Sequence, residues 1–329
     1  MTSIVTPTTI WQARVRLKHQ VLRTPLLFSP ALSRRTGCQI YLKLECWQRC
    51  GCFKVRGAIN MVAALTPDER ARGLVTASSG NHGLAVAYAA STHGRPPTTV
   101  FVPQDADKTK VDKIKTLGAQ VLFHGQNYLE AYDRAQQYAR DQDAVYVHSH
   151  AHPLIIAGQG TIGLEIVEDL PDVEAFLVPI GGGGLIAGVS TAAQSAAPAV
   201  QIIGVEPSAA PAAYLSMRDG VCHERIAIRP SLADGLLGGV GRLPFALFRS
   251  RIREVVLVEE DEIAQAMWTF QQDEQLMIEA ASSVGLAAIL SGKVDLADKK
   301  VVLILTSRNV DADKFNKVMR RLEGKQTHA

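Results

Sequence analysis

The sequence predicts an α/β protein whose mainly parallel β-sheets are covered by helices on both faces. Short apolar runs rich in Val and Ile alternate with longer segments of helical period almost to the end of the chain. This alternation is typical of parallel strands joined by helical crossovers. Two of the runs lead into glycine-containing turns followed by a helix. Open parallel sheets bind their ligands at such carboxyl ends of strands, so the fold class also predicts where a site should lie.

Each expected strand is a short run of β-branched and aliphatic residues bounded by turn-forming or charged residues. We expect strands at residues 40–44, 74–77, 98–102, 119–123, 175–180, 201–205, 254–258 and 301–305. The segments between them carry apolar residues three or four positions apart, as one face of a helix requires. These segments predict helices that include residues 53–65, 81–94, 108–118, 128–142 and 261–275. No repeat or linker marks a domain boundary.

The composition indicates a globular protein with a small-molecule partner. The 35 basic and 32 acidic side chains give a net charge of +3 and form no basic stripe that would suit nucleic acid or an acidic membrane. Five cysteines, an odd number in a chain of 329 residues, argue against a disulfide framework and favour a cytoplasmic location. The first 20 residues lack the apolar stretch of a secretory signal. The uncharged stretch 175–205 is interrupted by Pro179 and four glycines, so a strand-helix-strand unit explains it better than a membrane span.

A run of four glycines, Gly181–Gly184, follows the expected strand 175–180 and precedes a helix. Backbone N–H groups in such a turn converge on an anion, and the positive end of the helix dipole adds to the attraction, so a phosphate fits. The same stretch also matches a dinucleotide fingerprint through Gly182, Gly184 and Ala187, with Glu206 at the end of the next strand. Such fingerprints usually open their domain, whereas this one follows four earlier strands.

A second candidate anion site is "TASSGNHGLA", residues 76–85, which also joins a strand to a helix. It presents backbone donors beside Ser78, Ser79 and Asn81, and these suit the carboxylate of a substrate derived from an amino acid. Ser and Asn are also common helix caps, which is the alternative explanation.

Lys54 begins the expected helix 53–65 among apolar neighbours. Such surroundings should lower the affinity of the amine for its proton, and a neutral amine can attack a carbonyl. Lys54 is therefore a candidate Schiff-base lysine, against the alternative of an ordinary surface charge.

Five motifs together resemble one enzyme family. They are "GCFKVRGA" (51–58), "SSGNHG" (78–83), "AGQGTIGLEI" (157–166), "VPIGGGGLIAG" (178–188) and "LTSRNVD" (305–311). Their order and approximate spacing are similar to those of the pyridoxal-phosphate-dependent serine/threonine dehydratases, a family that also includes serine racemases and hydroxyectoine-utilisation dehydratases. The resemblance extends from residue 24 to residue 315, nearly the whole chain. A dinucleotide site would account for only one of the five motifs.

The resemblance implies a fold type II, tryptophan-synthase-beta-like architecture with two open, mainly parallel twisted sheets. It implies a large cofactor-binding domain of residues 1–72 and 149–329. Residues 73–148 would form a small mobile domain that closes over the substrate. A homodimer or homotetramer is also expected of a member of this family.

The resemblance also assigns roles to individual residues. Lys54 would hold pyridoxal 5'-phosphate as an imine, and Ser79 would be a candidate catalytic acid. The cofactor would further contact Phe53, Asn81, Gly181, Gly182, Gly183, Gly184, Gly235 and Thr306, of which the four consecutive glycines take the phosphate, Asn81 the phenolic oxygen and Thr306 the pyridine nitrogen. The substrate would contact Ser78, Ser79, Gly80, Asn81, His82 and His152, and no metal is expected.

Thr306 has a chemical consequence for the expected reaction. A hydroxyl is too weak an acid to keep the ring nitrogen protonated, so loss of a β-substituent should outrun transamination. Lys54 would remove the Cα proton, and the cofactor phosphate or Ser79 would protonate the leaving hydroxyl. We therefore expect a dehydratase that converts a threonine- or serine-like amino acid to a 2-oxo acid and ammonia. Alternatives are an amino-acid racemase with Ser79 as its acid, a nicotinamide-dinucleotide-binding protein, and a sensor without turnover.

The motifs depart from the family in two places near the cofactor. Cys50 and Cys52 stand where members commonly have Thr and Ser, and we interpret these thiols, with Cys46, as small side chains of the lysine loop rather than as a metal or redox cluster. Arg308 stands where members have Gly, which predicts a cation next to the nitrogen end of the cofactor.

Two further groups resemble metal sites. His148, His150 and His152 share one face if the chain is extended there, and we interpret them as walls of the substrate pocket, with a metal as the alternative. Glu206 matches an acid of the cation site in racemase-like members, but Ala212 stands at the position of its partner. We therefore expect no metal dependence from this site.

Overall fold

The structure is a computed structural model that describes residues 4–78, 80–104, 106 and 108–326. In this part of the chain the strands form a six-stranded sheet of order β1-β2-β10-β7-β8-β9 and a four-stranded sheet of order β5-β4-β3-β6. All strand pairs are parallel except β1 with β2. The strands are β1 (Leu26–Phe28), β2 (Gln39–Lys43), β3 (Leu74–Ala77), β4 (Thr98–Val102), β5 (Gln120–Phe123), β6 (Val145–Tyr146), β7 (Ala175–Pro179), β8 (Gln201–Pro207), β9 (Glu254–Val258) and β10 (Lys300–Ile304).

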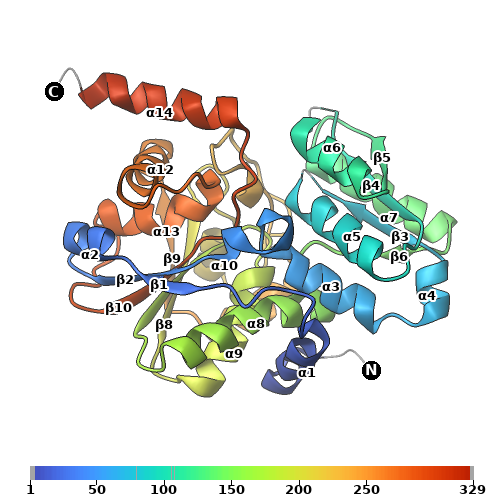
Figure 1. Cartoon of the computed structure of the whole chain (residues 1–329), viewed down its shortest axis with the longest axis horizontal. Helices are drawn as coiled ribbons and strands as arrows, with labels where there is room; N and C mark the ends of the chain where they lie inside the picture. Colours follow the sequence, from blue (N-terminus) through green and yellow to red (C-terminus); the bar gives the residue numbers. More distant parts are fainter. Residues whose placement is uncertain (1–3, 79, 105, 107, 327–329) are drawn as a thin grey trace.

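Helices connect the strands and cover both sheets (Figure 1). The α-helices are α1 (Pro7–Leu17), α2 (Pro30–Thr36), α3 (Lys54–Ala64), α4 (Pro67–Ala71), α5 (Asn81–Thr92), α6 (Lys108–Thr116), α7 (Tyr128–Asp141), α8 (Pro153–Asp169), α9 (Gly184–Ala196), α10 (Ala212–Asp219), α11 (Arg242–Phe248), α12 (Glu260–Glu274), α13 (Ala280–Leu290) and α14 (Ala312–Gln326). The residues that the structure describes also form the short 3-10 helices η1 (Glu45–Trp47), η2 (Arg49–Gly51) and η3 (Asp234–Leu236).

The predicted fold class is confirmed, because two mainly parallel sheets lie between layers of helices. Each of the eight expected strands overlaps a strand of the structure, and the expected helices correspond to α3, α5, α6, α7 and α12. The strands β1 and β6, which have three and two residues, were not expected from the sequence.

The six-stranded sheet has an apolar core on each face, as the period of two along its central strands requires. Along β10, Val301 and Leu303 belong to a core shared with α12 and α13, whereas Val302 and Ile304 belong to the core shared with α8 and α9. Figure 1 shows these helix pairs on opposite sides of the sheet.

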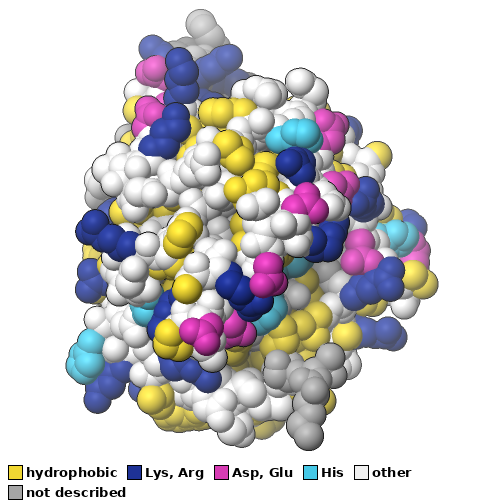
Figure 2. Space-filling view, turned by 90° about the vertical axis from the view of Figure 1, so that its right-hand side faces the viewer, with side chains coloured by type: hydrophobic (Ala, Val, Ile, Leu, Met, Phe, Trp, Pro, Cys, Tyr) yellow, Lys and Arg dark blue, Asp and Glu magenta, His cyan; other side chains and the backbone are white. Residues whose placement is uncertain are grey.

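The four-stranded sheet is built in the same way on a smaller scale. On one side Val100 packs with residues of α5 and α6, and on the other Phe101 packs with α7. Ala131, Ala135 and Ala139 recur every four residues along α7 and form its buried face. Figure 2 views the molecule from the side of the four-stranded sheet. It shows the basic side chains of Lys and Arg mixed with the acidic side chains of Asp and Glu, without a large patch of either charge.

No helix in the described part of the chain is both long enough and apolar enough to cross a membrane. The uncharged stretch 175–205 is instead the unit β7, α9 and β8, as the sequence predicts.

Candidate active site

A cavity of about 830 Å³ lies at the carboxyl ends of β3, β7 and β10, and both sheets contribute to its lining. This is the position at which open parallel sheets bind ligands. The cavity brings together most of the residues that the sequence analysis named, although they are spread over about 250 positions of the chain. The lining includes Phe53, Lys54, Ser78, Gly80, Asn81, His82, Gly181, Gly182, Gly183, Gly184, Gly235 and Thr306. Ser79 lies outside the described residues.

Lys54 is the first residue of α3, and its side chain is half-buried where it lines the cavity. Its Nζ donates a hydrogen bond to the carbonyl oxygen of Ser149 at 3.0 Å and lies 5.2 Å from the centre of the Phe53 ring. Burial lowers the pKa of Lys54 to about 8. The expected loss of proton affinity is therefore confirmed, and its main cause is burial.

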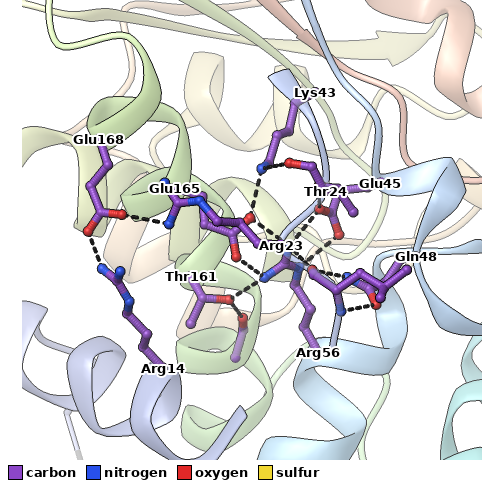
Figure 3. Close-up of polar contacts among 12 residues, drawn as sticks. Arg14, Arg23, Thr24, Lys43, Glu45, Gln48, Arg56, Thr161, Glu165 and Glu168 are labelled. Atoms are coloured by element: carbon purple, nitrogen blue, oxygen red, sulfur yellow. Dashed lines mark hydrogen bonds and ion pairs between the residues drawn. The ribbon is translucent and has the colours of Figure 1, made fainter. Parts of the chain in front are cut away.

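A buried ionic network anchors α3 just beyond Lys54 (Figure 3). The Arg56 guanidinium donates to both oxygens of Glu45 at 2.8 Å and to both oxygens of Glu165 at 2.7 and 2.8 Å. Lys43 Nζ donates to Glu165 at 2.7 Å. Two cations thus balance two carboxylates, and a buried network of this kind holds α3 against α8 in one position.

The four glycines form a cradle between β7 and α9. Gly183 has φ +86° and caps the N-terminus of α9, a conformation that favours glycine. A Cβ atom on Gly182 would lie 2.2 Å from the His150 ring, and one on Gly184 would lie 2.8 Å from the His150 carbonyl oxygen. Side chains are therefore excluded, and the free N–H groups of the first turn of α9 are left for an anion.

The second loop ends at Gly80, the N-cap of α5. Ser78 Oγ accepts a hydrogen bond from the Gly80 N–H at 2.9 Å. The ring of His82 is buried, which lowers its pKa to about 3. Its neutral ring donates from Nε2 to the Val147 carbonyl at 3.0 Å. The histidine thus fixes the loop to the chain that follows β6.

The Asn81 side chain is held by two residues from the half of the molecule that contains the six-stranded sheet. Its Nδ2 donates to the Glu279 carboxylate at 2.8 and 3.1 Å, and its Oδ1 accepts from Asn309 Nδ2 at 2.8 Å. These partners fix which end of the amide carries the hydrogens. Glu279 could not be recognised from the sequence, because a single Glu before a helix carries no motif and its partner Asn81 is 198 positions away.

Thr306 follows β10 and is buried at the edge of the cavity. Its hydroxyl lies 3.0 Å from Ser282 Oγ, which also accepts from the Ser307 N–H at 2.9 Å. Gly235 lies in η3, where a Cβ atom would approach Ala281 to 3.6 Å. Ser282 could not be recognised from the sequence, because it lies in an Ala- and Ser-rich helix without a motif.

The three histidines after β6 do not act as one group. His148 and His150 line the cavity, and their rings meet edge to face with centres 4.6 Å apart. Burial lowers the pKa of His148 to about 4 and that of His150 well below its usual value, so both rings are neutral. The structure does not bring His152 to the cavity lining, because its Nδ1 accepts from the Leu154 N–H and caps α8.

Metal ligation by these histidines finds no support in the structure. Within residues 4–78, 80–104, 106 and 108–326, no group of three or more His, Cys, Asp or Glu side chains could hold a metal ion. The Glu206 carboxylate accepts from the N–H groups of Ala213 and Tyr214 at 2.8 and 2.9 Å, and burial raises its pKa to about 8. Glu206 therefore caps α10, and both of its carboxylate oxygens are occupied by this role.

The expectation for Arg308 is wrong. This side chain is exposed, and its Cγ lies close to Gly51, where a Cβ atom would come within 3.2 Å of it. Among the described residues, Arg308 is not one of those that line the cavity. The residue lies in the irregular segment after β10, where the alternation of a strand no longer sets side-chain direction.

The cysteines of the lysine loop are neutral thiols. Burial raises the pKa of Cys46 and of Cys50 to about 12, and it raises the pKa of Cys52 further. Cys52 forms a backbone bridge with Ser307, which joins the lysine loop to the segment after β10. These thiols therefore pack as small side chains and are not activated.

Comparison with known proteins identifies the family. The sequence model described as "Pyridoxal-phosphate dependent enzyme" matches residues 17–307. The chain belongs to this family. It is 44% identical to an L-threonine ammonia-lyase of Thermotoga maritima over 319 residues, which cover 97% of this chain and 79% of the relative. It is 34% identical to a serine racemase of Oryza sativa subsp. indica, with 92% of this chain and 90% of the relative covered.

Solved structures of the same family have the same fold. The serine racemase of Dictyostelium discoideum superposes with a TM-score of 0.87 at 34% identity and covers 94% of this chain and 100% of that one. Threonine deaminase isoform 2 of Solanum lycopersicum superposes with a TM-score of 0.87 at 32% identity and covers 97% and 95%. The expected fold type II architecture is confirmed.

The cofactor of this family is pyridoxal phosphate, and the residues present fit it. The cavity offers a buried amine of lowered pKa at Lys54 and a cradle at Gly181–Gly184 that excludes side chains. A neutral hydroxyl at Thr306 lines the same cavity. The amine suits the aldehyde of the cofactor, the cradle suits its phosphate, and the neutral hydroxyl suits its pyridine nitrogen.

Proposed function

We propose that this protein is a pyridoxal-phosphate-dependent ammonia-lyase that converts a β-hydroxy amino acid, such as threonine or serine, into a 2-oxo acid and ammonia. One observation carries the proposal: the buried amine of Lys54, the cradle at Gly181–Gly184 and the N-terminus of α5 line one cavity. Relatives named L-threonine ammonia-lyase, 44% and 42% identical to this chain, support the substrate class.

Each part of the cavity has a proposed task in holding the cofactor. Pyridoxal phosphate, when bound, supplies an aldehyde that condenses with amines and a ring that withdraws electron density from the carbon next to the amine. Lys54 would hold the aldehyde as a Schiff base, and Gly181–Gly184 with the N-terminus of α9 would bind the phosphate. Phe53 and Gly235 would lie on the two faces of the ring, and Asn81 would contact the phenolic oxygen.

Lys54 is also the proposed base. An amine with a pKa of about 8 is partly neutral near pH 7, so it can accept the Cα proton of the substrate. The N-terminus of α5 would hold the substrate carboxylate through Ser78 and the backbone of Gly80, Asn81 and His82. Ser79 remains the candidate that protonates the leaving hydroxyl, with the cofactor phosphate as the other donor.

Thr306 is proposed to favour elimination over transamination. Its hydroxyl is paired with Ser282, and the described residues that line the cavity bring no carboxylate into hydrogen-bond contact with it. A hydroxyl does not keep a pyridine nitrogen protonated, so the electron demand of the ring stays moderate. Loss of the β-hydroxyl, which removes the negative charge from Cα, is then the faster outcome.

Amino-acid racemisation is the second candidate function. It is supported by the similarity to serine racemases, which extends over 92% of the chain in sequence and 94% in structure. Chiral analysis of serine recovered from the reaction separates the two functions. A rate of racemisation above the rate of 2-oxo acid formation would favour the racemase.

The Lys54 assignment has a direct test. Purified Lys54→Ala should lose the visible absorption of the bound cofactor and should release no 2-oxo acid from threonine or serine. Lys18→Ala, which removes an exposed lysine, is the matched control and should keep both properties. An unchanged visible spectrum in Lys54→Ala would refute the assignment.

We also infer how the molecule is organised around this reaction. Residues 73–148, which contain the four-stranded sheet, would form a small mobile domain that closes over the substrate, and residues 1–72 and 149–329 would form the large cofactor-binding domain. A cytoplasmic location and assembly into a homodimer or homotetramer remain predictions of the sequence and of the family.

A further inference from the structure

One buried ion pair in the cavity has no part in the chemistry described above. Lys110, on α6, places its Nζ 3.2 Å from Oε1 of Glu279, which precedes α13. The two side chains are 12% and 4% exposed, and both residues line the cavity. The pair therefore joins a helix of the four-stranded sheet to a helix of the six-stranded sheet inside the site.

The position of Lys110 relative to α5 indicates what its charge can reach. Its side chain lies across Gly80, the N-cap of α5. A Cβ atom on Gly80 would lie 2.4 Å from Lys110 Cδ and 3.4 Å from Nζ. The ammonium thus lies next to the first turn of α5, whose N–H groups have no partner within the helix. This turn is where the substrate carboxylate is proposed to bind.

Glu279 gives a physical reason for a cation at this place. Its carboxylate accepts a hydrogen bond from Asn81 Nδ2 and contacts the Lys110 ammonium. Because Asn81 is the first residue of α5, the Glu279 carboxylate lies close to the N-terminus of that helix. A substrate carboxylate would bring a second negative charge into this low-dielectric region, where like charges repel strongly. A cation between the two carboxylates turns this repulsion into attraction on both sides.

An ion pair that served only to stabilise the fold would be unexpected at this buried position. Burying two charges costs desolvation energy that their mutual attraction barely repays, and apolar side chains of similar size often stabilise a protein more. The pair is therefore best explained by a third charge that completes it when the site is in use.

We propose that Lys110 is a further substrate-binding residue, whose ammonium, held in place by Glu279, binds the α-carboxylate of the amino acid at the N-terminus of α5. This inference rests on the proposed function, because it assumes an amino-acid substrate. It also makes the closing of the site depend on the substrate, since the carboxylate would then be bound from α6 as well as from α5.

The test compares Lys110→Met with Lys113→Met in the holoenzyme. Lys113 is exposed on the same helix, so its variant controls for the loss of one positive charge. A charge-assisted hydrogen bond corresponds to a factor of about 10 to 100 in affinity. We expect Lys110→Met to raise the KM for L-threonine by about that factor, with kcat changed much less, and Lys113→Met to behave as the unchanged protein.

A ligand without the carboxylate separates binding from a structural effect. Dissociation constants of L-threonine and of L-threoninol, in which a CH₂OH group replaces the carboxylate, can be measured from the change in cofactor absorption. Lys110→Met should lose affinity for threonine and keep its affinity for threoninol. An equal loss for both ligands, or a KM unchanged from that of Lys113→Met, would overturn the inference.

Two further measurements keep the result interpretable. Lys110→Gln, which keeps a polar group of similar length, should bind threonine more weakly than the unchanged protein, and the visible spectrum shows whether either variant still holds its cofactor. If the unchanged protein binds threonine without releasing a 2-oxo acid, the proposed function fails, whereas the comparison of threonine with threoninol still decides the role of Lys110.

Discussion

At the scale of single residues, the hydroxyl of Ser282 determines how Thr306 is presented to the cavity. Ser282 Oγ accepts from the Ser307 N–H at 2.9 Å and lies 3.0 Å from the Thr306 hydroxyl. Ser282→Ala leaves a buried N–H without its acceptor, so we expect a loss of about 1–3 kcal/mol of unfolding free energy. The measurement is the urea midpoint of the cofactor-loaded protein.

The next residue provides the matched control. Ser283 Oγ is also buried, but it has no hydrogen-bond partner among the described residues. Ser283→Ala therefore removes a polar group whose burial is uncompensated and should leave the midpoint unchanged or raise it. Equal midpoints for the two variants would show that the Ser282 hydrogen bonds contribute nothing to stability.

Lys54 leads to a prediction about pH. The neutral amine attacks the aldehyde of the cofactor, and burial lowers the Lys54 pKa from 10.5 to about 8. The rate at which cofactor-free protein gains visible absorption on mixing with pyridoxal phosphate should therefore rise with pH up to about 8 and then level off. A rate that continues to rise towards pH 10.5 would show that Lys54 is not desolvated.

At the scale of elements, α3 depends on the network around Arg56. Arg56→Met removes the cation that pairs with the buried carboxylates of Glu45 and Glu165, and only Glu165 keeps a second cation, Lys43. We expect this loss to lower the free energy of unfolding by about 3–5 kcal/mol. Because α3 begins at Lys54, the affinity for pyridoxal phosphate should fall as well. Both quantities can be measured by unfolding and by titration of the cofactor.

A surface pair is the control for the Arg56 variant. Arg72 lies 3.0 Å from Asp143, and both side chains are largely exposed. Exposed pairs contribute about 0–1 kcal/mol, so Arg72→Met should leave cofactor affinity unchanged. Similar losses in Arg56→Met and Arg72→Met would mean that the buried network does not position α3.

The elements also show what the sequence could predict. The strands of four or more residues were recognisable, because most of them are buried on both faces and so form a continuous apolar run. The strands β1 and β6, with three and two residues, are too short to show any period. The direction of Arg308 was misjudged for a related reason, since the segment after β10 is irregular and follows no alternation.

At the scale of the whole molecule, composition alone could not divide the chain into domains. The chain leaves the six-stranded sheet after β2 and returns to it at β7, and no linker marks either crossing. Four of the five motifs contribute residues to the lining of one cavity, whereas the fifth, residues 157–166, lies within α8. Glu279 and Lys110 belong to that cavity but to no motif. Their pairing is a property of how the two sheets are placed, which periodicity along the chain does not encode.

The proposed closing of residues 73–148 over the substrate gives the prediction at this scale. A ligand with an amine, a carboxylate and a β-hydroxyl but no Cα proton, such as 2-methylserine, should occupy the site without being consumed. Because the carboxylate would be bound from α5 and α6, we expect slower amide exchange in these two helices and a smaller radius of gyration in solution scattering. Lys110→Met, saturated with the same ligand, should show a smaller change in α6 than in α5. A radius of gyration and exchange rates that stay constant on saturation would contradict a mobile small domain.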